Sequence, residues 1–406
     1  MAAEYLANNG FTVNIFETKP TPARKFLMAG RGGLNLTYAP SAKPTDEIFG
    51  PAWSHIRPLI ENFPPSALIK WAEDLGQETF VGTSNRVFPK SMKASPLLRA
   101  WLERLNSLPI TFHVRHTWIG WANESKGKTQ SNRNHCLRFN YQVHGIVEHQ
   151  ADAVIFAMGG ASWPRLGADG AWVQAFEGCG IEVTPLTPFN AGVTTNWSPR
   201  FLDRAIAQPL NRIAIKINAH QSYGEAMITK TGLEGGAIYE LNRPIKHALS
   251  TDAAPTIAID LRPDVSHEAL QSRLAKPRNG QSTATFLRKA ARLSKQSIAL
   301  LHETNGKNLP TDPEELSNLI KNVAIKITGL SDIDRAISTS GGIPETQLNQ
   351  NAMLTNIPGA FVAGEMRDWD APTGGFLLQA TFATALQAAT GAQHWLESAP
   401  ETPVAK

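Results

Sequence analysis

Two glycine-containing loops are the parts of this sequence whose residue types and spacing suit cofactor chemistry. Near the end of the chain, the apolar run 361–365 leads through a polar loop, 368–376, into an Ala-rich pattern that predicts a helix over 377–395. Gly374 and Gly375 stand immediately before this helix, where bare backbone N–H groups favour an anionic or electron-rich ligand. A glycine pair before a helix is more often only a turn, so a second feature has to support this interpretation.

The second loop lies near the start of the chain. The segment 24–37 combines basic residues with several glycines, and it follows a predicted strand, 11–17, that ends in Glu17. A helix over 1–9, Gly10, this strand and its terminal acid are typical of the second half of a dinucleotide-binding βαβ unit, where the acid accepts hydrogen bonds from ribose hydroxyls. A merely solvated strand end is the other interpretation of Glu17. Two distant loops of this kind predict one extended ligand.

The glycine turn that should open such a unit does not occur in this sequence. There is no G-x-G-x-x-G, and the first residues have the pattern of the helix that would follow that turn. We expect either that the chain starts too late or that a truncation has removed part of the phosphate cradle. Backbone donors to a charged group contribute about 1.5–3 kcal/mol each, so their loss would weaken cofactor binding.

Composition narrows the class of protein. The chain has 406 residues, of which 42% are hydrophobic and 18% charged, enough to bury the cores of two or three domains. Two cysteines, Cys136 and Cys179, lie far apart, so we expect neither a disulfide framework nor a metal site. No apolar run reaches the roughly 18–20 residues that cross a bilayer. We therefore expect a cytoplasmic protein without a membrane partner, and the mild net charge of +4 does not favour nucleic acid.

The pattern of elements predicts an α/β protein with an insertion. The run 151–160 reads as a buried parallel strand that leads into Gly159 and Gly160. After Pro188 the pattern changes to several β-like runs and then to a helical group that includes 313–327. We interpret 1–188 and 334–406 as the two parts of one cofactor-binding domain, truncated at its N-terminus, and 189–333 as an inserted domain for the substrate.

Together these segments resemble those of the BaiN-like (YhiN-like) flavoproteins, which have the glutathione-reductase-type FAD-binding, Rossmann-like fold. The resemblance covers nearly the whole chain and is most specific in 24–37, 155–160, 227–237, 338–342 and 364–379. It implies FAD as cofactor, extended across the carboxyl ends of a parallel sheet.

The resemblance also implies which residues contact each part of FAD. Glu17 would bind the adenosine ribose, and Val114 would contact the adenine through its backbone. Gly159 and Gly160 would line the passage of the chain past the cofactor. The other expected contacts fall in two groups: Arg24, Lys25, Gly30, Arg31, Gly32, Gly33, Asn35 and Thr37 along the diphosphate and flavin, and Gly364, Glu365, Asp368, Gly374, Gly375 and Phe376 along the ribityl chain and the pyrimidine edge.

These features favour an FAD-dependent oxidoreductase that moves a hydride between a small organic substrate and flavin, with NAD(P)H as a transient co-substrate. The absence of a C-x-x-x-x-C pair argues against disulfide reduction. No catalytic acid or base can be named, and the oligomeric state is left open. The alternatives are an RNA-interacting flavoprotein, for which Arg288-Lys289 and Arg292 with Lys295 are the only hint, and a cofactor-deficient remnant.

Overall fold

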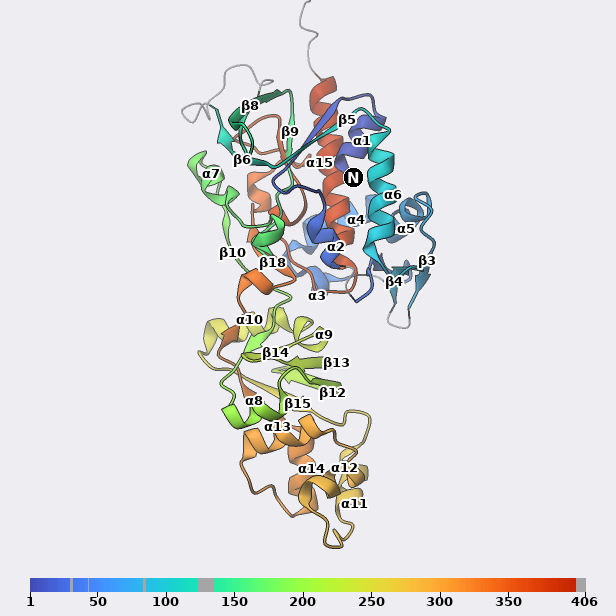
Figure 1. Cartoon of the computed structure of the whole chain (residues 1–406), viewed down its shortest axis with the longest axis vertical. Coiled ribbons are helices and arrows are strands. Elements are labelled where there is room, and N and C mark those ends of the chain that lie inside the picture. Colours follow the sequence, from blue (N-terminus) through green and yellow to red (C-terminus); the bar gives the residue numbers. More distant parts are fainter. Residues whose placement is uncertain (30–31, 43, 83–84, 123–134, 399–406) are drawn as a thin grey trace, which may run out of the picture. The chain divides into compact units, whose positions relative to one another are not determined.

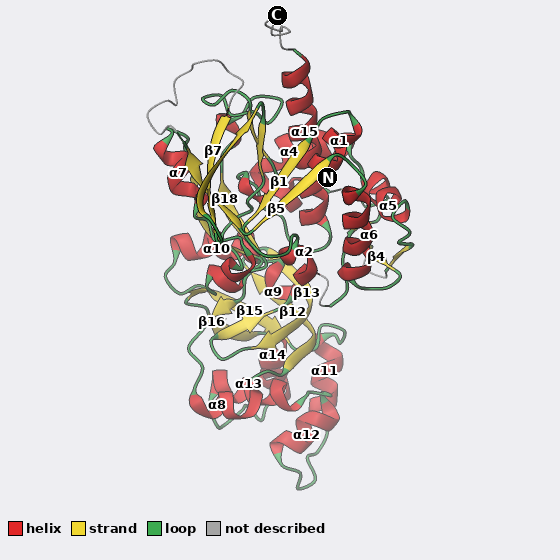
Figure 2. Ribbon diagram, turned by 45° about the horizontal axis from the view of Figure 1, so that its top comes forward, coloured by secondary structure: helices red, strands yellow, loops and turns green. Residues whose placement is uncertain are grey.

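The structure, a computed structural model, describes the chain except for residues 30–31, 43, 83–84, 123–134 and 399–406. The chain divides into two compact units, the first made of 1–187 and 338–406 and the second of 188–337. Figure 1 shows the elements in chain order, and Figure 2 shows helices and strands in both units. The mixed α/β class predicted from the sequence is confirmed. The role of 189–333 as a substrate domain stays a prediction.

The first unit contains two pairs of parallel strands, two three-stranded antiparallel sheets and a long C-terminal helix. β1 pairs with β5 and β19 pairs with β9, both in parallel, while the antiparallel sheets have the strand orders β2-β4-β3 and β6-β7-β8. Its elements are α1 (Ala2–Asn8), β1 (Val13–Glu17), α2 (Arg24–Ala29), β2 (Thr37–Tyr38), α3 (Asp46–Phe49), α4 (Trp53–Asn62), α5 (Pro65–Glu73), β3 (Thr79–Val81), β4 (Arg86–Pro89), α6 (Ala94–Asn106), β5 (Ile110–Val114), β6 (His116–Trp121), β7 (His135–Tyr141), β8 (Gly145–Ala151), β9 (Val154–Phe156), α7 (Trp172–Gly178), β10 (Thr184–Phe189), β18 (Ser338–Gly342), β19 (Ala360–Val362) and α15 (Phe376–Glu397).

The second unit is built on a seven-stranded sheet of order β16-β15-β12-β13-β14-β11-β17. In Figure 1, α9 and α13 lie on opposite sides of its central strands. Its elements are β11 (Val193–Thr194), α8 (Pro199–Ala205), β12 (Pro209–Ile217), β13 (His220–Ile228), β14 (Gly232–Glu234), α9 (Gly236–Tyr239), α10 (Asn242–Thr251), β15 (Thr256–Asp260), α11 (His267–Leu274), α12 (Thr283–Ala290), α13 (Lys295–Asn305), α14 (Pro313–Lys321), β16 (Val323–Lys326) and β17 (Gly329–Leu330).

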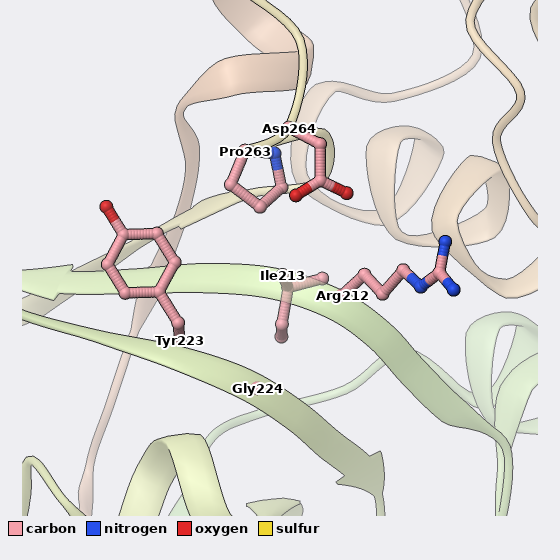
Figure 3. A pocket seen from close by; sticks show the side chains of 6 residues that line it. All are labelled: Arg212, Ile213, Tyr223, Gly224, Pro263 and Asp264. Atoms are coloured by element: carbon pink, nitrogen blue, oxygen red, sulfur yellow. The ribbon is translucent and has the colours of Figure 1, made fainter. Parts of the chain in front are cut away.

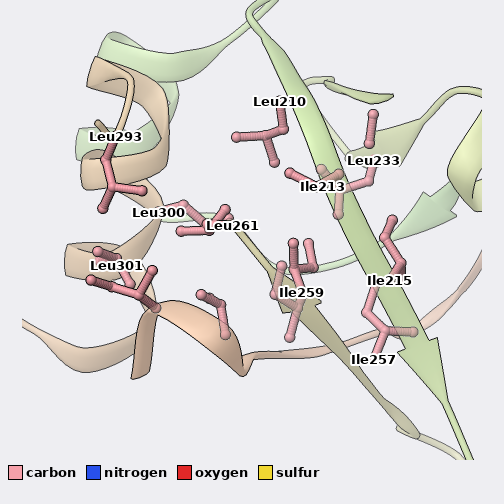
Figure 4. Packing of buried hydrophobic residues seen from close by; sticks show 14 of the residues in the cluster. Leu210, Ile213, Ile215, Leu233, Ile257, Ile259, Leu261, Leu293, Leu300 and Leu301 are labelled. Carbon is pink, nitrogen blue, oxygen red and sulfur yellow. The ribbon is translucent and has the colours of Figure 1, made fainter. Parts of the chain in front are cut away.

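Local sequence explains where the helices of the second unit begin. Four consecutive helices, α11 to α14, each follow a Ser or Asp whose side chain accepts a backbone N–H of the first turn: Ser266, Ser282, Ser294 and Asp312. The branched and leucine side chains of β12 and β15 then pack against α13 in one apolar core, which Figure 4 shows. Such caps satisfy backbone donors that the helix itself leaves free, so the boundaries follow from sequence.

One predicted helix is wrong at its C-terminal end. The run 313–327 was predicted as a single helix, but α14 ends at Lys321 and β16 follows as an edge strand of the sheet. The Val323–Lys326 segment alternates buried and exposed residues, as a strand with one face on the core does. A short apolar run is compatible with the period of a helix and with that of a strand. Here the segment forms a strand because β16 pairs with β15.

Candidate functional site

The N-terminus of α15 is shaped by two glycines in the left-handed region. Gly374 has a φ of 132° and Gly375 a φ of 90°, conformations that other residues adopt at a cost. A Cβ atom on Gly375 would lie 2.4 Å from the carbonyl carbon of Thr37. Glycine is therefore required at this position, because α15 begins directly against the backbone of β2.

Side chains connect the same two segments. With its amide oriented to match its neighbours, Asn35 accepts a hydrogen bond from the Gly375 N–H (3.0 Å) and donates one to the Thr37 carbonyl (2.9 Å). The buried Thr37 hydroxyl donates to Oε1 of Gln379, one turn into α15, at 2.7 Å. Loops that are more than 300 residues apart in sequence are thus in direct contact.

The first turn of α15 has free hydrogen-bond donors. Within the described part of the chain, neither the Phe376 nor the Leu377 N–H has an acceptor in the protein, and no side chain caps this 22-residue helix. The Phe376 ring packs on Tyr38, with ring centroids 4.7 Å apart. Burial raises the pKa of Tyr38, and its hydroxyl has no hydrogen-bond partner. Free helix N–H groups beside an apolar wall and an orphaned hydroxyl fit a flat ring with a hydrogen-bond-accepting edge, such as a flavin.

A half-buried ion pair joins α2 to the turn after β19. The Lys25 ammonium lies 2.6 Å from Oε2 of Glu365 and donates to the Ser162 hydroxyl at 2.7 Å. The other carboxylate oxygen of Glu365 accepts the Thr339 N–H at 3.0 Å. These contacts hold a lysine and a glutamate together although 340 residues separate them.

Gly159 and Gly160 lie beside this ion pair. A Cβ on Gly159 would come within 3.9 Å of Oε2 of Glu365, so this glycine lies next to the carboxylate. A Cβ on Gly160 would overlap the Thr339 side chain, whose hydroxyl accepts the Ala161 N–H at 2.9 Å. The lack of side chains here allows the loop after β9 to approach β18 closely.

Gly364 and Asp368 form hydrogen bonds with side chains of distant segments. The Gly364 N–H donates to the buried Thr384 hydroxyl at 3.0 Å, and Oδ2 of Asp368 accepts from the Thr184 hydroxyl at 2.7 Å. Between them, Arg367 is only 1% exposed and forms two hydrogen bonds with the carboxylate of Glu345, at 2.7 and 2.8 Å. This buried pair fixes the turn that leads from β19 towards α15.

Glu17 and Val114 lie opposite each other at the carboxyl ends of β1 and β5. One oxygen of the Glu17 carboxylate accepts the Lys19 N–H at 2.8 Å. Burial raises the pKa of Glu17, while the hydrogen bond from Lys19 and the charge of Arg24 lower it in part. A carboxylate has about four acceptor positions, so a partly buried one at a strand end is suited to accept further hydrogen bonds from a ligand's hydroxyl groups.

The remaining predicted positions of the 24–37 segment have different surroundings. Arg24 donates from Nε to the Thr21 hydroxyl at 3.0 Å. A Cβ on Gly32 would meet nothing within 4 Å, whereas one on Gly33, whose φ is 109°, would lie 2.5 Å from Cε of Met92. Two predicted site residues, Gly30 and Arg31, lie outside the described residues.

Three polar residues of this region were missed by the sequence analysis: Ser162, Thr339 and Gln379. Each binds a predicted site residue through a side chain or its backbone. Gln379 repeats the position of Gly375 one turn later, so helical spacing could have indicated it. Nothing local points to Ser162 or Thr339, because their partners come from distant segments.

A cluster of imidazole and aromatic rings covers β1, β5, β6 and β8. The His113 ring stacks on Phe16 with centroids 4.6 Å apart, and His149 lies 5.3 Å from His113 and 6.1 Å from His116. Burial and then the neighbouring histidines lower the pKa of His113 and His149. In the described residues no group of three or more His, Cys, Asp and Glu could hold a metal ion. No helix there is long and apolar enough to span a bilayer.

The chain belongs to the HI0933-like family, since the family model described as the HI0933-like protein Rossmann domain matches residues 1–391. The predicted family and the Rossmann-like fold class are therefore confirmed. A related protein is the 3-dehydro-bile acid delta(4,6)-reductase of Clostridium scindens, which is 22% identical over 385 residues, 92% of this chain and 90% of that protein. The predicted enzyme class, an oxidoreductase, is confirmed as well.

Solved structures with a similar chain path include two oxidoreductases. The E. coli quinol fumarate reductase is 14% identical, with 99% of this chain and 70% of that chain covered and a TM-score of 0.47. The 3-ketosteroid-delta4-(5alpha)-dehydrogenase of Rhodococcus jostii RHA1, solved with 4-androstene-3,17-dione, is 12% identical, with 97% and 94% covered and a TM-score of 0.46.

Proposed function

We propose that this protein is an FAD-dependent oxidoreductase that transfers a hydride between a small organic substrate and flavin, with NAD(P)H as a transient partner. One observation carries the proposal. The loop that contains Asn35 and Thr37 touches Gly375 at the start of α15, where the next two N–H groups have no acceptor. A helix N-terminus offers donors and a positive dipole to an electron-rich group.

The residues of the first unit have distinct roles in this proposal. Bound FAD supplies a hydride acceptor. The N–H groups of Phe376 and Leu377 would bind the polar edge of its ring, and Tyr38 would exclude water from the ring's apolar side. The Lys25–Glu365 pair would position the turn after β19, and the Glu17 carboxylate would bind ribose hydroxyls. All the predicted contacts with FAD, including those of Arg24, Gly30, Arg31 and Val114, stay predictions.

The related bile acid reductase suggests which substrates to try first. Its name describes reduction of a 3-dehydro-bile acid, so cyclic enones and ketones are the first candidates for this chain, followed by amines. Sequence identity of 22% does not define a substrate, and the class proposed here is a small organic molecule with a reducible or oxidisable carbon.

The test is spectroscopic. The purified chain should show flavin absorption, and heat-released cofactor should co-elute with FAD rather than FMN in chromatography. Under anaerobic conditions NADPH or NADH should bleach the flavin, and a candidate enone should restore the colour. A chain that neither retains nor binds added FAD would refute the proposal, whereas FAD binding without bleaching would remove only the nicotinamide partner.

A second candidate is an RNA-interacting flavoprotein, which one observation favours. The segment 262–295 contains eight Lys and Arg residues against two Asp and Glu, a net charge of +6, whereas the whole chain carries +4. Binding that depends on phosphate contacts weakens steeply with salt. Absence of tRNA binding at low salt would eliminate this candidate, and binding that persists unchanged at high salt would show that phosphate contacts do not drive it.

A further inference from the structure

One face of the small sheet β2-β4-β3 carries an arginine among aromatic rings. In an antiparallel pair, directly opposed residues have their side chains on the same face. Tyr38 of β2 is opposite Arg86 of β4. Phe88, two residues further along β4 and therefore on the same face, is opposite Phe80 of β3. The other face of the sheet packs on the core, where Val87 is fully buried.

This face begins at the proposed flavin site. A Cβ on Gly374 would lie 3.8 Å from Nε of Arg86 and 3.0 Å from the Phe376 ring. Tyr38, which is opposite Arg86 across the strands, packs on the same ring. The guanidinium group therefore lies beside the N-terminus of α15, which is the positive end of the helix dipole. Because a cation gains nothing from that end of a helix, both favour a negatively charged group placed next to them.

Beyond Arg86 the face is apolar and partly open to solvent. Phe80 stacks on Phe88 with ring centroids 5.8 Å apart. A Cβ on Gly33 would lie 2.5 Å from Cε of Met92 and 3.7 Å from the Phe88 ring, so the Met92 side chain borders the same rings. Phe80 is 40% exposed and Met92 38%. Two residues of a strand span about 7 Å, so the distance from Arg86 to the stacked rings suits a ligand of about two fused rings.

Arg86 gives this face its charge. Within the three strands, all of which the structure describes, it is the one charged residue on the face. Beyond the ends of β3 and β4, the Lys90 ammonium and the Glu78 carboxylate form an ion pair, so their charges compensate each other. A ligand that lies along the face therefore meets a cation at the α15 end and apolar rings over the rest of its length.

We propose that Arg86, Phe88 and Phe80 form the substrate-binding wall of the proposed flavin site and select a flat, apolar ring compound that carries a carboxylate. A guanidinium group binds a carboxylate through two parallel hydrogen bonds, and aromatic rings pack on flat apolar surfaces. The carboxylate binds at the α15 end of the wall, and the ring body extends over Phe88 towards Phe80. This inference rests on the proposed function and names the substrate class of the same site.

The second unit has a pocket that could also bind an aromatic acid. Its volume is about 420 Å³, and Figure 3 shows Arg212 and Tyr223 at its two ends. The Tyr223 side chain is 65% exposed. Asp264 also lines this pocket, and its carboxylate repels an anionic ligand. Removal of the Tyr223 ring tests whether a probe binds there instead of at Arg86.

The test compares two probes of the same shape, 2-naphthoate and its neutral amide 2-naphthamide, in calorimetric titrations of the FAD-loaded full chain. The unmodified chain should bind the carboxylate about tenfold more tightly than the amide. In Arg86→Met this ratio should fall to within about twofold, and Arg86→Lys should keep part of it, because the charge stays without the planar fork. Phe80→Ala should weaken both probes by about threefold to tenfold and leave the ratio unchanged.

Two control variants and the flavin content separate the outcomes. Arg57→Met, at an exposed arginine of α4, and Tyr223→Ala should leave both affinities within about twofold. The ratio compares two probes on one protein, so partial loss of folded chain does not imitate the expected result. If the FAD-loaded chain does not prefer the carboxylate, if Arg86→Met keeps the preference, or if Tyr223→Ala loses as much affinity as Phe80→Ala, the inference is overturned while the proposed function stands. A chain that does not take up FAD overturns both.

Discussion

Replacement of Gly375 by alanine is the sharpest perturbation of the candidate flavin site. The added Cβ would lie 2.4–2.6 Å from three backbone atoms of Thr37, so neither segment can yield by a side-chain rotation. The φ of 90° costs a non-glycine residue about 1–2 kcal/mol, and the overlap roughly 1–3 kcal/mol more. We expect a total destabilisation of about 2–5 kcal/mol, which for a unit of this size lowers the melting temperature by roughly 5–15 °C.

Two measurements separate loss of the site from loss of the fold. Thermal unfolding gives the change in stability, and quenching of flavin fluorescence on titration gives the FAD dissociation constant. Movement of β2 away from α15 breaks the bond from the Gly375 N–H to Asn35, so FAD affinity should fall at least tenfold at temperatures where the variant is folded. Gly178→Ala is the matched control, because a Cβ there meets nothing within 4 Å.

The reasoning is refuted if Gly375→Ala has the melting temperature and FAD affinity of the Gly178→Ala control. Unchanged affinity with lowered stability would show that the contact with β2 supports the fold without contributing to the site. Normal stability with lost affinity would place the added methyl group against the cofactor instead of against Thr37.

Three further predictions concern charged groups. Lys25→Met should weaken FAD binding and lower the free energy of unfolding by roughly 1–2 kcal/mol, because it leaves the Glu365 carboxylate without its partner. The double variant Lys25→Met/Glu365→Gln should recover part of this loss. Additive losses from the two replacements would contradict the pairing. Arg367→Met should lower the free energy of unfolding, measured with urea, by about 3–5 kcal/mol, because it leaves the Glu345 carboxylate unpaired. The control Arg57→Met, at an exposed ion pair, should lower it by less than about 1 kcal/mol. Equal losses would show that burial of the Arg367–Glu345 pair is unimportant. Because burial and the neighbouring His116 lower the pKa of His149, the unfolded chain binds more protons than the folded chain between about pH 7 and pH 5. The melting temperature should therefore fall as the pH falls, and it should fall less in His149→Gln. Identical slopes of melting temperature against pH in the two proteins would rule out this contribution.

Much of the local structure could be predicted because its causes are local. The spacing of apolar residues in the sequence predicts a helix over 267–274, and α11 has these bounds, His267–Leu274, because Ser266 caps its first turn. The sequence also predicts a strand over 110–114, and β5 has these bounds, Ile110–Val114. The predicted end of the helix 313–327 was wrong. Its residues 323–326 suit the period of a helix and that of a strand, and they form a strand because they pair with β15.

The glycine pair, the Ala-rich helix after it and the acid at the end of a strand were determined by the sequence alone, because each is a property of neighbouring residues. Only the tertiary structure decided which groups meet. Lys25 pairs with Glu365, and Gly375 touches Thr37, across more than 300 residues. Contacts of this kind depend on how distant elements pack, and no local period or cap records them.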